Sequence, residues 1–144
     1  MSADESELPA RLARVLEPRR EILEAYLFGS RARGESGPTS DTDVAVFLDR
    51  GRAREGPFGY AAELASAVGS ELGVTEVDVV VLNDASPLLY HRVLREGQRI
   101  FARELTATTT REGRALSRYC DYLPQLHKIE AAHAARMARG DFGR

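Results

Sequence analysis

Asp41 and Asp43 are two residues of this 144-residue chain whose type and spacing could support chemistry. They begin the apolar, β-branched segment at 42–48, and in an extended chain a spacing of two puts both carboxylates on one side. Two carboxylates this close repel each other, and a hard divalent cation such as Mg²⁺ relieves the repulsion. The pair therefore predicts a cation site.

A polyphosphate would complete such a site, because a cation held by one or two carboxylates usually takes its other ligands from water and substrate phosphates. Gly29 lets the backbone approach a ligand closely, and Ser30 could donate its backbone N–H and its hydroxyl to phosphate oxygens if a short helix begins there. Arg31 and Arg33 could add positive charge, or they could be ordinary surface arginines. We expect the phosphates to bind along this loop.

Asp78 is a third candidate because it lies inside the apolar run VDVVV at 77–81. An acid in a buried strand carries a desolvation cost unless a partner compensates it. If this strand lies beside the one that Asp43 begins, the three carboxylates form the arrangement of a two-metal phosphoryl-transfer site. Two simpler alternatives remain open, namely a turn and helix-capping cluster for the upstream pair and a solvent-facing acid at a sheet edge for Asp78.

The elements that must position these residues alternate between helices and strands. Periodicity and capping residues predict helices over about 5–16, 60–72 and 87–96, strands over 25–28, 42–48 and 74–83, a short edge strand over 99–102, and a final helix from about Leu105 with an interruption at Pro124. We expect the strands at 42–48 and 74–83 to be buried on both faces. The order predicts an α/β or α+β domain, a small mixed sheet with helices packed on it.

Composition excludes several function classes. The net charge of −2 argues against a protein that coats nucleic acid or an anionic membrane, so we expect neither a membrane nor stable nucleic-acid binding. The single cysteine, Cys120, cannot form an internal disulfide or a cysteine metal cluster, and we expect it to be a small buried residue. The N-terminal segment is charged and lacks the apolar run of a signal peptide, which favours a soluble, cytoplasmic protein.

A family resemblance joins these motifs. Gly29-Ser30, Arg33-Gly34, Ser40-Asp41-Thr42-Asp43 and the distal Asp78 resemble the minimal nucleotidyltransferases of the DNA polymerase beta superfamily. The resemblance covers about residues 5–103. It implies a polymerase beta-like fold, with a minimal nucleotidyltransferase domain at 1–103 and a C-terminal helical extension at 104–144 packed on the same domain.

The resemblance also implies roles for individual residues. Asp41, Asp43 and Asp78 would be the catalytic residues and the ligands of two Mg²⁺ ions, and Asp78 could also help to deprotonate the acceptor. The nucleotide, ATP, would be bound by Gly29, Ser30, Arg31, Arg33 and Ser40. The reaction would be attack of an acceptor hydroxyl on the α-phosphorus of ATP, with pyrophosphate leaving.

Minimal nucleotidyltransferases of this size are similar to antitoxins that pair with a HEPN-domain ribonuclease toxin, some of which transfer AMP to a toxin tyrosine. The resemblance implies that function, a HEPN toxin as partner and a hetero-oligomer with it. The toxin's own signature, an arginine four to six residues before a histidine, is absent around His91, His127 and His133. Two alternatives remain, a steric antitoxin without catalysis and a transferase that modifies a small molecule.

Overall fold

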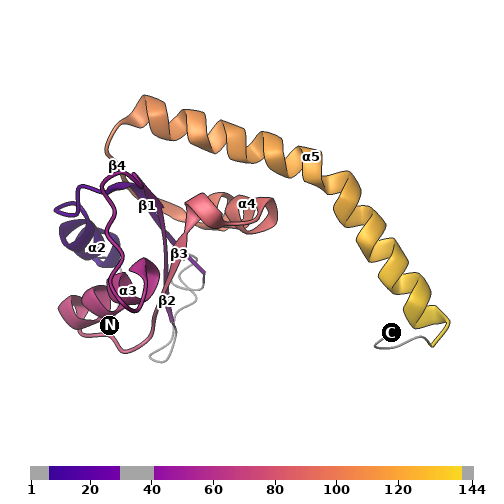
Figure 1. Cartoon of the computed structure of the whole chain (residues 1–144), viewed down its shortest axis with the longest axis horizontal. Coiled ribbons are helices and arrows are strands. Elements are labelled where there is room, and N and C mark those ends of the chain that lie inside the picture. The colour runs from indigo at the N-terminus through magenta and orange to yellow at the C-terminus, as the bar shows by residue number, and fades with distance from the viewer. Residues whose placement is uncertain (1–6, 30–40, 141–144) are drawn as a thin grey trace.

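The computed structural model describes residues 7–29 and 41–140, and in this part of the chain four strands form one mixed sheet. The strand order is β3-β2-β1-β4, with β1 antiparallel to β2 and β4 and with β2 parallel to β3. The elements are α2 (Leu8–Leu16), β1 (Ile22–Phe28), β2 (Thr42–Leu48), α3 (Tyr60–Leu72), β3 (Val77–Val81), the 3₁₀ turn η1 (Leu82–Asp84), α4 (Pro87–Glu96), β4 (Gln98–Ala102) and α5 (Leu105–Ala138). Helices cover both faces of the sheet (Figure 1), which confirms the predicted fold class.

The central strand β2 buries both of its faces, as its apolar sequence predicts. Val44, Val46 and Leu48 belong to the core that α2 and α3 cover, whereas Ala45 and Phe47 belong to a second cluster beneath α4 and the start of α5. This alternation assigns every second residue of the strand to the α4 and α5 face. It also decides on which side of the sheet an acid at the head of β2 must lie.

The ends of the helices follow the predicted signals. Gly73 ends α3 in the left-handed conformation, with φ of 72°, and Gly97 follows α4. At the start of α4, the Ser86 hydroxyl accepts a hydrogen bond from the backbone N–H of Leu89 at 3.2 Å, and Pro87 occupies the first turn. The capping prediction is confirmed, and α4 begins at a defined point on the sheet face.

Strand β3 corrects one prediction. It was expected to be buried on both faces, but it is an edge strand that pairs only with β2 among the described residues, and its valines are half-buried. Asp78 is exposed. The desolvation argument for Asp78 was therefore wrong, because an apolar run of five residues fits a half-buried edge strand as well as it fits a central strand.

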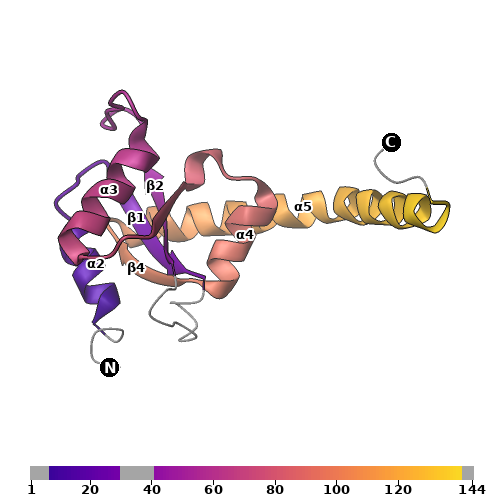
Figure 2. The ribbon, with the colours of Figure 1, turned by 90° about the horizontal axis from the view of Figure 1, so that it is seen from below.

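Helix α5 corrects a second prediction, because it continues through Pro124 where an interruption was expected. Figure 1 shows the helix bending along its length instead of stopping, the usual effect of a proline that removes one backbone hydrogen bond. Its first half packs on α4, with Thr108 and Ala115 buried. Its second half is largely exposed and projects from the domain (Figure 2). Cys120, near the middle of the helix, is exposed and not buried as expected.

The division at residue 103 into a domain and an extension stays a prediction. The extension expected at 104–144 corresponds largely to α5, and only its first half lies against the sheet and α4. No helix in the described ranges is both long and apolar enough to cross a membrane.

A buried carboxylate fixes the first half of α5 to the sheet. Glu24 on β1 is 0% exposed, and it accepts hydrogen bonds from Arg111 Nε at 2.7 Å, from Arg111 Nη2 at 2.5 Å and from the Thr108 hydroxyl at 2.9 Å. The Arg111 guanidinium also lies 4.8 Å from the centre of the Phe47 ring. Because both donors belong to α5, this network joins residues 84 and 87 positions apart in the chain.

Candidate functional site

Asp43 and Asp78 are direct neighbours in the sheet. The parallel pairing of β2 with β3 places Asp43 opposite Asp78 and Val44 opposite Val79. By strand alternation Asp43 shares a face with Ala45, which lies under α4. The adjacency of the two strands that was inferred from the sequence is confirmed, but Asp78 belongs to an edge strand and not to a central one.

Asp41 and Asp43 flank Thr42, whose side chain is fully buried. The backbone N–H of Thr42 donates to the Glu76 carbonyl oxygen at 3.0 Å and so begins the pairing between the two strands. Alternation then directs Asp41 to the same side as Asp43, where it is exposed. Asp41 lies one residue before β2, so the common side of the two carboxylates stays a prediction from their i, i+2 spacing.

Gly29 follows β1 and lies against the Asp43 carboxylate. Its backbone has φ of 80°, and a Cβ atom at this position would overlap Asp43 Oδ2. The preceding residue, Phe28, pairs with Asp43 across the antiparallel strands. The positive φ and the contact with the Asp43 carboxylate favour glycine at this position, so the chain that follows β1 begins against the candidate cation site.

The carboxylates at this site repel one another. Burial, then Asp78, then Asp41 raise the pKa of Asp43 above its ordinary value, while Arg92 on α4 acts in the opposite direction. Each of the first three makes the ionised carboxylate less favourable. The site thus stores electrostatic repulsion that a bound cation would relieve.

The residues present fit Mg²⁺, although they do not already enclose it. Within the described ranges, no three acidic, histidine or cysteine side chains stand close enough together to surround a metal ion. The donors are nevertheless hard carboxylate oxygens, and Asp43 feels the repulsion of both other aspartates. Mg²⁺ prefers such ligands and usually keeps several positions for water and phosphate.

The remaining residues predicted for nucleotide binding, Ser30, Arg31, Arg33 and Ser40, lie outside the described residues. Their roles stay predictions. Gly29 and Asp41 are the described residues on either side of this segment.

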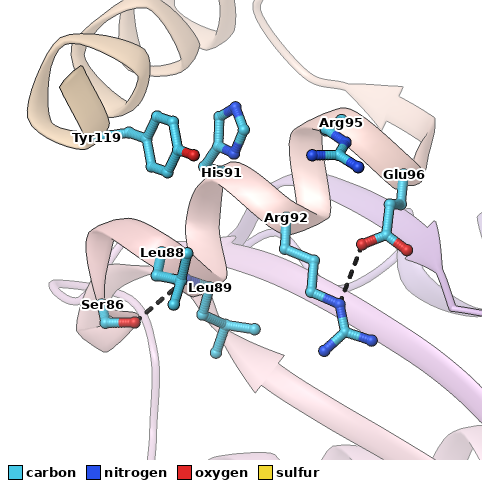
Figure 3. A pocket seen from close by; sticks show the side chains of 8 residues that line it. All are labelled: Ser86, Leu88, Leu89, His91, Arg92, Arg95, Glu96 and Tyr119. Atoms are coloured by element: carbon cyan, nitrogen blue, oxygen red, sulfur yellow. Dashed lines mark hydrogen bonds and ion pairs between the residues drawn. The ribbon is translucent and has the colours of Figure 1, made fainter. Parts of the chain in front are cut away.

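Sequence reasoning missed the contribution of α4. A pocket of about 390 Å³ lies along this helix, and Tyr119 of α5 closes one side of it. Figure 3 shows His91 facing Tyr119, with the ring centres 3.6 Å apart and the planes 3° from parallel, while Arg92 extends from another side of the helix. His91 was expected to be a surface or packing residue, and it packs. The sequence did contain a signal for Arg92, namely a positive residue on α4, the first α-helix after Asp78.

A model of the family described as polymerase beta, nucleotidyltransferase matches residues 10–105. The chain belongs to this family. The matched segment begins in α2 and ends at the first residue of α5, so it contains the whole sheet and all three aspartates of this nucleotidyltransferase.

Two relatives resemble the nucleotidyltransferase at more than one-third sequence identity. A candidate protein adenylyltransferase of Methanocaldococcus jannaschii is 36% identical over 75 residues, which are 52% of this chain and 75% of the relative. A solved structure described as a minimal nucleotidyltransferase candidate is 35% identical over 65% of this chain and 93% of its own, with a TM-score of 0.54. These similarities agree with the family assignment.

Solved toxin–antitoxin structures share the fold over a longer stretch. A chain from a toxin–antitoxin complex with AMP-PNP matches with a TM-score of 0.64 and 23% identity over 92% of this chain and 95% of its own. A chain from the complex of a tri-AMPylated Shewanella oneidensis HEPN toxin with its MNT antitoxin matches with a TM-score of 0.59 and 21% identity over 95% and 96%. Their coverage shows that the fold extends beyond the family match at residue 105, into α5.

Proposed function

We propose that this nucleotidyltransferase is the antitoxin of a toxin–antitoxin pair and transfers AMP from ATP to a hydroxyl, a tyrosine by expectation, of a cognate HEPN ribonuclease toxin. The observation that carries the proposal is the register that sets Asp43 beside Asp78, with Gly29 against the Asp43 carboxylate. The adenylyltransferase relative supports the reaction, and the AMPylated toxin complex supports the acceptor class. Cytoplasmic location stays a prediction.

In the proposed reaction, the acceptor oxygen forms a bond to the α-phosphorus while the bond from that phosphorus to the α,β-bridging oxygen breaks. Pyrophosphate leaves with the bond electrons, and the hydroxyl proton passes to a carboxylate or to water. We assign that proton to Asp78, and its exposure at the sheet edge supports this role.

The site residues have different proposed roles in binding the cations and the phosphates. Asp41, Asp43 and Asp78 would hold two Mg²⁺ ions, which when bound would neutralise phosphate oxygens and stabilise the entering and leaving oxygens. Gly29 would let the backbone approach the phosphates closely, and we keep Ser30, Arg31, Arg33 and Ser40 as the proposed binding residues. Half-buried Asp43 fixes the position of the cluster relative to the sheet.

The experiment is an incubation of the purified chain with the proposed cognate HEPN toxin, Mg²⁺ and ATP labelled at the α-phosphate. We compare the wild type with Asp43→Asn and with a matched control, Asp84→Asn, whose side chain is 73% exposed beyond the far end of β3. Label should enter the toxin with the wild type and with the control but not with Asp43→Asn. Equal labelling by all three proteins would refute the assignment of the site.

A steric antitoxin is the second candidate, because the exposed half of α5 carries large apolar side chains. Ile129 is 58% exposed and Met137 is 50% exposed, as expected of a surface that a partner covers. In that case Asp43→Asn would still neutralise the toxin in cells.

A small-molecule transferase is a weaker alternative, since relatives of that kind usually carry a larger second domain. It would instead produce Asp43-dependent label in small molecules.

A further inference from the structure

Helix α4 packs on the sheet face that Asp43 shares with Ala45, since Ala45 is buried in one cluster with Tyr90 of this helix. Val93 is buried in one cluster with Phe28, the residue that pairs with Asp43. Gly97, which follows the helix, lies so close to the sheet that a Cβ atom there would be 3.1 Å from the Leu27 carbonyl oxygen and 3.2 Å from Phe28 Cβ. The last turn of α4 is therefore held against the strand end from which Gly29 leaves.

Arg92 is the neighbour of Val93 on this turn. Its side chain is 59% exposed, and Nε lies 3.1 Å from Glu96 Oε2 on the same helix. Figure 3 shows Arg92 and Glu96 joined along one flank of α4, away from the stacked His91 and Tyr119. The guanidinium is thus a solvent-accessible cation that lines the pocket, on the part of α4 that packs beside Phe28, the residue paired with Asp43.

The site needs positive charge beyond its divalent cations. Three carboxylates and a triphosphate together carry more negative charge than two divalent cations neutralise. Arg92 is a cation of the described chain whose field reaches Asp43, where it opposes the repulsion from Asp41 and Asp78. A guanidinium suits this task because its planar set of N–H donors matches phosphate oxygens.

We propose that Arg92 is a nucleotide-binding residue, which donates hydrogen bonds from α4 to the phosphate chain of ATP held at Asp41, Asp43 and Asp78. This inference rests on the proposed function and assigns one further contact to the same site. Glu96 orients the side chain through Nε, and a guanidinium that uses this nitrogen still has donors at both Nη atoms.

The test is the affinity of the chain for a non-hydrolysable ATP analogue with Mg²⁺, measured by titration calorimetry for Arg92→Gln and Arg92→Lys. The matched control is Arg52→Gln, since Arg52 is 64% exposed, pairs locally with Asp49 and follows the opposite end of β2. Loss of a charge-assisted contact should weaken binding about tenfold to a hundredfold in Arg92→Gln. Arg92→Lys should retain part of the affinity, and Arg52→Gln should bind like the wild type.

Thermal melting separates a binding role from a structural one, because all three variants should unfold near the wild-type temperature. Equal affinity of Arg92→Gln and Arg52→Gln would overturn the inference while Asp43-dependent labelling of the toxin still stood. Normal analogue affinity with lost toxin labelling would also overturn it, because Arg92 would then contact the acceptor protein. Calorimetry needs no turnover, so it decides the role of Arg92 even if no protein is labelled.

Discussion

Glu24 and Asp43 are two acids on adjacent strands and on the same face of the sheet, yet their surroundings differ. Glu24 is fully buried and accepts three hydrogen bonds, two of them from the guanidinium of Arg111. Asp43 is half-buried, and its strongest electrostatic neighbours are two further carboxylates. The comparison teaches that a carboxylate satisfied within the chain holds the fold together, whereas a cluster of like charges awaits a ligand.

The largest stability change should come from breaking the satisfied pair. Arg111→Met leaves a buried Glu24 carboxylate with only the Thr108 hydroxyl, and loss of one partner of a buried ion pair costs about 3–5 kcal/mol of unfolding free energy. Urea denaturation measures this loss. The double variant Glu24→Leu with Arg111→Met should recover most of it, because it leaves no unpaired buried charge.

This result would sharpen the comparison if cation binding survived. Under conditions where Arg111→Met is folded, its affinity for Mg²⁺ and nucleotide should match that of the wild type, because Asp41, Asp43 and Asp78 are unchanged. If the unfolding free energy of Arg111→Met lay within about 0.5 kcal/mol of the wild-type value, the assigned role of Glu24 would be contradicted, since that range is typical of surface substitutions.

A smaller change is expected where the backbone meets the site. Gly29→Ala introduces a Cβ atom at a φ of 80° and displaces the Asp43 carboxylate that it overlaps. The left-handed conformation costs an L residue about 1–2 kcal/mol, and we expect a loss of this size in the unfolding free energy. Calorimetric titration should also show weaker binding of Mg²⁺ with nucleotide. Unchanged binding would mean that Gly29 does not define the position of Asp43.

The smallest expected effect is an increase in the unfolding free energy. In a chelating buffer, Asp43→Asn should raise the unfolding free energy at neutral pH by up to about 1 kcal/mol, a modest value because solvent screens a half-buried charge. The pKa of Asp43 is raised on folding, so the wild type loses stability as the pH rises from the ordinary value of 3.8 through the raised one. The advantage of the variant should therefore vanish below that ordinary pKa. A variant less stable than the wild type at neutral pH would contradict the repulsion.

Local patterns in the sequence predicted much of this architecture and the core of the site. The β-branched run at 42–48 and the Ser86-Pro87 cap each specify their element locally, and the i, i+2 spacing of Asp41 and Asp43 predicts their common side. The edge position of β3 was not predictable, because strand order depends on pairings between distant segments. Ser30, Arg31, Arg33 and Ser40 lie outside the described residues, so their predicted roles stand untested.

Contacts over long sequence separations were the other gap. Glu24 and Arg111 are 87 positions apart, and neither carries a motif that suggests the other. Arg92 is one of many arginines, and only the packing of α4 on the sheet brings its charge near Asp43. Pro124 indicated a break, but the helix continues through it because a proline costs one hydrogen bond and the rest of the helix is intact.

The central claim, that the aspartate cluster is a cation site, is tested most directly by Mn²⁺ binding followed by electron paramagnetic resonance with a non-hydrolysable ATP analogue present. We compare the wild type, Asp43→Asn and Asp84→Asn. The account predicts that the wild type and Asp84→Asn bind the ion with equal affinity and that Asp43→Asn weakens binding at least tenfold, since a metal-ligating carboxylate is lost. Equal affinity for all three proteins would contradict it.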